Sequence, residues 1–108
     1  MPVDPRELLP LKPLVFQVLL ALTEGERHGW SLVREIQQRT GGERVLPANF
    51  YRTLRAMLAD ELIEEAGRSE DRRYFRATAL GRQAARLEAR RLQELLTDAR
   101  TRRLLRKT

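Results

Sequence analysis

The feature that most constrains the fold is an uninterrupted helical pattern at the C-terminal end of the sequence. From Thr78 or Leu80 to Lys107, leucine and alanine recur at helical spacing among arginine, glutamine and glutamate, and neither proline nor glycine follows Gly81. One helix of this length would span roughly 40 Å, which is longer than a small domain can cover. Part of its apolar stripe needs a second surface, and a second copy of the chain is the economical partner. The residues expected at this dimer contact are Leu87, Leu92, Leu95, Leu96 and Ala99.

Three shorter helical patterns and one hairpin pattern precede this segment. Helices are expected from Leu14 until Gly25 ends the first, from Gly29 to Thr40 before Gly41 and Gly42, and from Pro47 to Asp60. Strands are expected at 62–66 and 72–77, joined by a five-residue connection. The sequence therefore predicts a mostly α (α+β) fold with a two-stranded wing. We divide it into a poorly regular, proline-rich leader with one helical turn (1–13), a helix and hairpin domain (14–77) and a long C-terminal helix (78–108).

The sequence offers little for catalysis. It contains no cysteine and a single histidine, His28, which leaves no disulfide, no zinc–thiolate site and no pair of histidine ligands. Glu64 and Glu65 are adjacent on a predicted strand and so point to opposite faces. There is no glycine-rich phosphate loop. We therefore expect a protein that is not an enzyme and that holds neither a metal nor a cofactor.

The charge of the chain indicates its partners. The net charge is +6 with a pI near 10.9, and the basic excess lies in residues 67–108. Such a basic half favours a nucleic-acid or an anionic-membrane partner, although a general bias toward arginine would raise the charge as well. The longest apolar run, 18–22, is too short to cross a bilayer, and the first residues do not resemble a secretion signal. We expect a cytoplasmic protein without a membrane partner.

The order of three helices, a hairpin and a long helix is that of a winged helix-turn-helix protein, in which the third helix reads bases in the major groove. On that helix Arg52 can donate to guanine and Asn49 can pair with adenine. Arginines at the wing suit phosphates or the minor groove. The predicted contacts to double-stranded DNA are Asn49, Tyr51, Arg52, Thr53, Arg55, Arg68, Arg72 and Arg73.

Four segments, in this order, resemble the PadR family of transcriptional regulators. They are 26–32 with its His-Gly-Trp opening of a helix, 46–54 at the third helix, 62–64 at the first strand, and 72–82 with its Thr-x-x-Gly start of the last helix. The resemblance implies a homodimeric winged-helix transcription factor in a bacterial cytoplasm. It is expected to be a repressor that acts on an inverted repeat. A small-molecule effector of unknown identity is a further partner that the family implies.

The sequence departs from the family pattern at several positions. Leu46 replaces a serine, which removes a helix cap. Glu61 replaces a glycine before the first strand, so the turn there must avoid a positive φ or accept strain. Trp30 replaces a tyrosine, and we expect it to serve as a packing residue. We expect His28 to form local hydrogen bonds at the start of its helix.

Two other functions fit part of the sequence. A protein-interaction module would dimerise through the long helix without contacting DNA, and it would have no need for the arginines of the third helix and the wing. The arginine-rich last helix could also lie on a membrane surface, but it lacks the aromatic anchors that such helices carry. Indifference to DNA at low salt would favour the interaction module.

Overall fold

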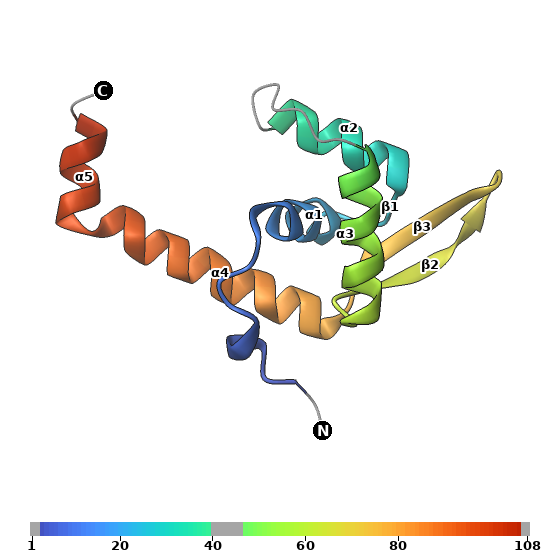
Figure 1. The fold of residues 1–108 in the computed structure, drawn as a ribbon, viewed down its shortest axis with the longest axis horizontal. Coiled ribbons are helices and arrows are strands. Elements are labelled where there is room, and N and C mark those ends of the chain that lie inside the picture. The colour runs from blue at the N-terminus through green and yellow to red at the C-terminus, as the bar shows by residue number, and fades with distance from the viewer. Residues whose placement is uncertain (1–2, 40–46, 107–108) are drawn as a thin grey trace.

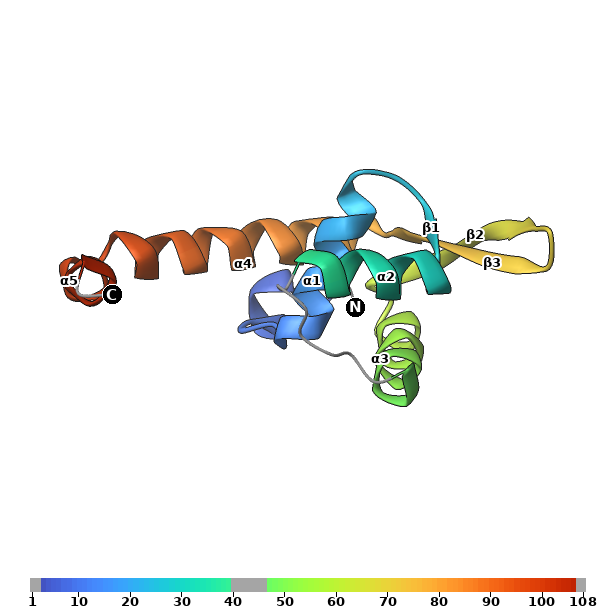
Figure 2. The ribbon, with the colours of Figure 1, turned by 90° about the horizontal axis from the view of Figure 1, so that it is seen from above.

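The computed structural model describes residues 3–39 and 47–106 and is an elongated molecule of 49 × 38 × 23 Å. Three helices form a cluster, with the wing extending from one side and the last helices from the other (Figures 1 and 2). The predicted end of the second helix at Gly41 and Gly42, and Leu46, lie outside the described residues. In chain order the elements are η1 (Pro5–Leu8), α1 (Pro13–Thr23), β1 (Arg27–His28), α2 (Gly29–Arg39), α3 (Pro47–Ala59), β2 (Ile63–Ser69), β3 (Arg72–Ala77), α4 (Ala79–Thr97) and α5 (Ala99–Arg106).

The three helices α1 to α3 build the core. Helices α1 and α3 each begin with a proline, whose fixed φ suits the first helical position. Each helix turns an apolar stripe inward, as their 3.6-residue spacing predicts. The largest fully buried side chains are Phe50, Leu19, Leu32, Ile36, Met57, Ile63 and Val18. The core thus joins α1, α2 and α3 to the first residue of β2.

The sheet has three antiparallel strands in the order β1-β3-β2, so the prediction of a two-stranded wing is wrong. The added strand, β1, has only two residues and therefore shows no alternation in the sequence. The connection between β2 and β3 is also shorter than the predicted five residues. It consists of Glu70 and Asp71, both with positive φ (53° and 63°), as two-residue hairpin turns require. We refer to the hairpin of β2 and β3 as the wing.

The Thr-x-x-Gly segment fixes α4 against the base of the wing. The Thr78 hydroxyl oxygen accepts a hydrogen bond from the Gly81 N–H at 3.0 Å and caps the helix, as predicted. A Cβ atom on Gly81 would collide with the Leu62 carbonyl oxygen, so the close approach requires glycine. Just before this contact, Glu61 adopts a φ of 60°, so the chain accepts the strain that a non-glycine residue brings there.

The predicted single C-terminal helix is divided in two at Asp98. This residue has extended dihedral angles (φ −61°, ψ 134°) and separates α4 from α5. Its carboxylate accepts a hydrogen bond from the Arg100 N–H at 2.8 Å and so caps α5. Arg100 also pairs with Asp98 and holds the pKa of its carboxyl below the usual value. A capping aspartate, with no proline or glycine nearby, therefore turns the chain (Figure 1).

The N-terminal segment packs against α4 instead of standing apart. Its one short helix, η1, is the predicted helical turn and contacts α4. Leu11 is buried, and its N–H donates to the carboxylate of Glu88 on α4. Glu88 is itself only 2% exposed and pairs with Arg91 at 2.6 and 2.9 Å, which lowers the pKa of the Glu88 carboxyl. A buried carboxylate thus ties the N-terminal segment to α4.

Candidate nucleic-acid interface

Helix α3 presents a polar face whose cations have no carboxylate nearby. Phe50, Leu54 and Met57 point into the core, so the opposite side of the helix faces outward (Figure 2). Arg52 and Arg55 lie on that exposed side. Within the described part of the chain, neither arginine forms an ion pair. Their guanidinium groups are therefore available to an external acceptor.

The arginines of the wing are held differently. Oε2 of Glu65 accepts from Nη2 of Arg73 at 3.1 Å, and its Oε1 lies 3.6 Å from Nε of Arg68. The hydrogen bond from Arg73 holds the pKa of the Glu65 carboxyl below its usual value. The guanidinium carbon of Arg73 also lies 5.5 Å from the centre of the Phe75 ring. One glutamate therefore pairs with two of the three arginines predicted to contact DNA from the wing.

The other face of the wing carries a separate set of charges. Glu64 accepts from Arg76 at 2.8 Å, and Arg76 also lies 3.7 Å from Glu26. The two adjacent glutamates thus serve opposite faces of β2, as the sequence predicts for neighbours on a strand.

A β-bulge lets Glu65 reach both of its arginines. In the register, Glu65 lies opposite Phe75, whereas Gly67 lies opposite Tyr74, so Ala66 is an extra residue on β2. In a regular strand, residues three apart point to opposite faces. The extra residue shifts the alternation by one and brings Glu65 and Arg68 to the same face. Gly67, with a φ of 127°, supplies the conformation that the bulge needs.

Arg72 lies beside a histidine instead of a carboxylate. Its Nη1 atom is 3.2 Å from Nε2 of His28 on β1. The Nδ1 atom of His28 lies 3.3 Å from the Ser31 backbone nitrogen, and the Ser31 hydroxyl donates to the His28 carbonyl oxygen at 2.9 Å. The His28 ring also makes an edge contact with Tyr74, with 5.4 Å between the ring centroids. His28 therefore has the local hydrogen-bonding role that the sequence predicts.

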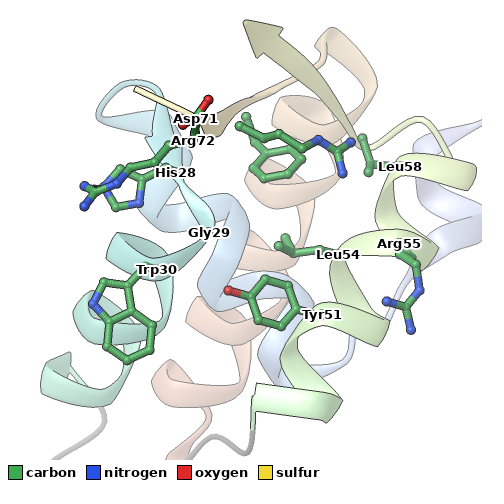
Figure 3. A pocket seen from close by; sticks show the side chains of 11 residues that line it. His28, Gly29, Trp30, Tyr51, Leu54, Arg55, Leu58, Asp71 and Arg72 are labelled. Carbon is green, nitrogen blue, oxygen red and sulfur yellow. Dashed lines mark hydrogen bonds between the residues drawn. The ribbon is translucent and has the colours of Figure 1, made fainter. Parts of the chain in front are cut away.

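A hollow of about 410 Å³ lies between the start of α2, helix α3 and strand β3 (Figure 3). The Trp30 side chain lines it and is 55% exposed, so the prediction that Trp30 packs in the interior is wrong. Tyr51 is the second exposed aromatic residue and rests against Gly29, where a Cβ atom would lie 3.2 Å from its ring. The polar residues around the hollow are His28, Arg55, Asp71, Arg72 and Arg73.

The structure brings some of the predicted site residues together and separates others. Tyr51, Arg55, Arg72 and Arg73 line the hollow. Asn49 and Arg52 are exposed on α3, and Arg68 is exposed on β2. Thr53 lines a different hollow, which lies against the N-terminal segment at Leu8 and Leu11. Thr53 is therefore at the edge of the α3 face, away from the wing.

Sequence reasoning missed two features of this region. The first is strand β1, which brings His28 to Arg72 and carries too few residues to show a pattern. The second is the pairing of Glu65 with Arg68 and Arg73, which depends on the bulge at Ala66. The single signal in the sequence is Gly67, a residue that often marks a bulge when it interrupts a strand pattern.

Three outward helices, a β-wing and a polar α3 face define a winged helix-turn-helix protein. A sequence model described as the transcriptional regulator PadR-like family matches residues 18–87. This match covers more than half of the chain, and the chain therefore belongs to the PadR-like family of transcriptional regulators. It is a regulator and not an enzyme, as the sequence predicts. None of the curated protein sequences compared with the chain matches it.

Several solved structures share the fold. RosR of H. salinarum is 22% identical with a TM-score of 0.72, over 93% of this chain and 91% of that one. A PadR family transcription regulator from Clostridium difficile is 18% identical with a TM-score of 0.63, over 79% of this chain and 95% of that one. Because RosR comes from an archaeon, the predicted bacterial origin stays a prediction. No helix in the described residues is long and apolar enough to span a membrane.

Proposed function

We propose that the chain is a sequence-specific DNA-binding repressor that acts as a homodimer on an inverted repeat. The observation that carries this proposal is the exposed α3 face, where Arg52 and Arg55 have no carboxylate partner among the described residues. A helix of this kind in a winged-helix protein enters the major groove. Arg52 donates to guanine and Asn49 pairs with adenine in this proposal. Membership of a family of transcriptional regulators supports it.

A second copy of the chain completes the proposed DNA-binding unit through α4 and the start of α5. Leu87 and Leu92 are half-buried within the single chain, whereas Leu95 and Leu96 are 50% and 56% exposed and Ala99 is exposed as well. An exposed leucine pair far from its own core is typical of an interface between copies. Residues 14–77 then form the DNA-binding part and residues 78–108 the dimerisation part. Two α3 helices would read half-sites about one or two helical turns apart, in units of ~34 Å.

Effector control and a cytoplasmic location complete the proposal, and both rest on the family resemblance. The hollow beside Trp30 and Tyr51 lies on the proposed DNA side of the molecule. It is lined in part by the predicted DNA contacts Arg55, Arg72 and Arg73, so we assign it to the DNA interface.

The proposal is tested by titrating the protein into a labelled duplex taken from immediately upstream of its gene. Fluorescence anisotropy compares this duplex with a scrambled one at two salt concentrations. We expect tighter binding to the upstream duplex, with two chains per site. Equal and strongly salt-sensitive binding would leave only the electrostatic contribution. Absence of binding at low salt would favour the protein-interaction module.

A further inference from the structure

Glu65 occupies a position on the wing that DNA phosphates would otherwise fill. Its carboxylate lies within 3.1 Å of Arg73 and 3.6 Å of Arg68. Strand alternation places Glu65 on the same face of the sheet as Ile63 and Phe75. Phe75 and Arg73 both line the hollow against α3. Glu65 is therefore on the side of the wing that faces α3, where a bound duplex would pass.

The whole wing is electrically balanced by its own acidic residues. Between Ile63 and Ala77 the four arginines are Arg68, Arg72, Arg73 and Arg76, and the four acidic residues are Glu64, Glu65, Glu70 and Asp71. The positive charge that the sequence places in this half of the chain consequently lies in α4 and α5, where residues 79–106 contain eight arginines and three acidic residues. The wing offers phosphates little net attraction unless its internal ion pairs open.

An exposed ion pair opens easily. The side chains of Arg68, Arg73 and Glu65 are 68%, 47% and 38% exposed, and pairs of this kind are weak in water. A phosphate oxygen accepts the same guanidinium N–H groups that Glu65 accepts. When DNA takes these donors, Glu65 is left without a partner close to a phosphate, and the two negative charges repel each other.

We propose that Glu65 is a specificity-determining residue that competes with backbone phosphates for Arg68 and Arg73. This competition weakens the contribution of the wing to every DNA sequence equally. Discrimination between sequences is then left to the α3 face, where no such competitor is present among the described residues. The inference rests on the proposed DNA-binding function.

Glu64 provides a matched control for this proposal. It is the neighbouring residue on β2, it is also exposed, and it also pairs with an arginine. It lies on the opposite face of the strand, where its partner Arg76 also contacts Glu26. The substitutions Glu65→Gln and Glu64→Gln remove the same charge from adjacent positions, so any general effect of net charge is common to both.

The test measures binding of both variants to a labelled duplex of random sequence over a range of salt concentrations. In a dimer with two wings, Glu65→Gln should bind about three- to tenfold more tightly than the parent protein. Its plot of log affinity against log salt should steepen by about one unit per wing. Glu64→Gln should stay within about twofold of the parent. Equal effects of the two substitutions, or weaker binding by Glu65→Gln, would overturn the proposal.

A second measurement separates this proposal from the proposed function. Immobilised heparin is a polyanion that binds exposed arginines whether or not the protein reads DNA. Glu65→Gln should elute from it at higher salt than Glu64→Gln. If neither the parent nor the variants bind any duplex but this difference is present, the DNA-binding function fails and the competition by Glu65 stands. Identical elution of the two variants would refute the competition itself.

Discussion

Helix α3 and the wing both present arginines to the same side of the molecule, but their charges are in different states. Arg52 and Arg55 on α3 have no carboxylate partner among the described residues, and residues 47–59 contain no acidic side chain. Arg68 and Arg73 on the wing share Glu65, and the hairpin as a whole carries as many acidic residues as arginines. The difference teaches that a count of arginines overstates the charge that a partner meets. A free cation supports direct contact, and a paired one contributes only after exchange.

The largest expected effect comes from removing the second copy, which would weaken both regions at once. Leu96→Glu places a charge in the exposed leucine pair of α4. Loss of the dimer should reduce affinity for a duplex with two half-sites by about 100-fold or more, because paired binding is lost. Light scattering after gel filtration measures the mass, and anisotropy measures the affinity. Gln93→Glu adds the same charge to an exposed position of α4 outside the predicted contact and should change neither.

The next effect tests the α3 side of the comparison. Arg52→Ala should reduce affinity for the preferred duplex about 10- to 100-fold. Its affinity for scrambled DNA should change much less, because most of the sequence-independent attraction is retained. Arg76→Ala removes an equal charge from the far face of the wing and should leave the preference intact. Unchanged preference after Arg52→Ala would show that the α3 face does not read bases.

A smaller effect tests the wing side. The double substitution Arg68→Ala and Arg73→Ala should weaken binding to all duplexes uniformly, by about two- to fivefold. Each arginine is already neutralised in part by Glu65, so the salt slope should fall by less than the ~0.9 expected per phosphate contact. Anisotropy titrations at four or more salt concentrations give this slope. A full loss of ~0.9 for each arginine would mean that the pairing with Glu65 has no consequence for binding.

The smallest effect compares two neighbours within the wing. Arg72 lies beside the His28 ring, and Arg73 donates to Glu65. Because Arg72 has no carboxylate to release, Arg72→Ala should cost about twofold more affinity than Arg73→Ala. Competition between the two variants for one labelled random duplex resolves a difference of this size. The reverse order would contradict the account of paired and unpaired arginines.

Much of the fold follows from local sequence signals. The three core helices begin where the prolines and apolar spacing predict, and the outward face of α3 is the predicted one. The Thr78 cap and Gly81 are found as expected, and the collision that a Cβ atom on Gly81 would cause explains why glycine is required there. These features are predictable because each depends on a few residues close together in sequence.

The features that could not be predicted depend on tertiary contacts or on weak signals. Strand β1 exists because two residues pair with β3, and a pair of residues has no periodicity. The break at Asp98 comes from one capping side chain in a segment that otherwise favours a continuous helix. The exposure of Trp30 depends on where α2 ends against its neighbours. The pairing of Glu65 requires the bulge at Ala66, because a regular strand would point Glu65 and Arg68 to opposite faces.

The central claim is that α3 discriminates between sequences and that the wing adds a sequence-independent contribution. The most direct test is anisotropy of an upstream duplex and a scrambled duplex with the parent protein, Arg52→Ala, and the double Arg68→Ala and Arg73→Ala variant. The account predicts that the parent prefers the upstream duplex, that Arg52→Ala loses this preference, and that the wing variant keeps it while binding both duplexes less tightly. Preference that survives Arg52→Ala and disappears in the wing variant would contradict the account.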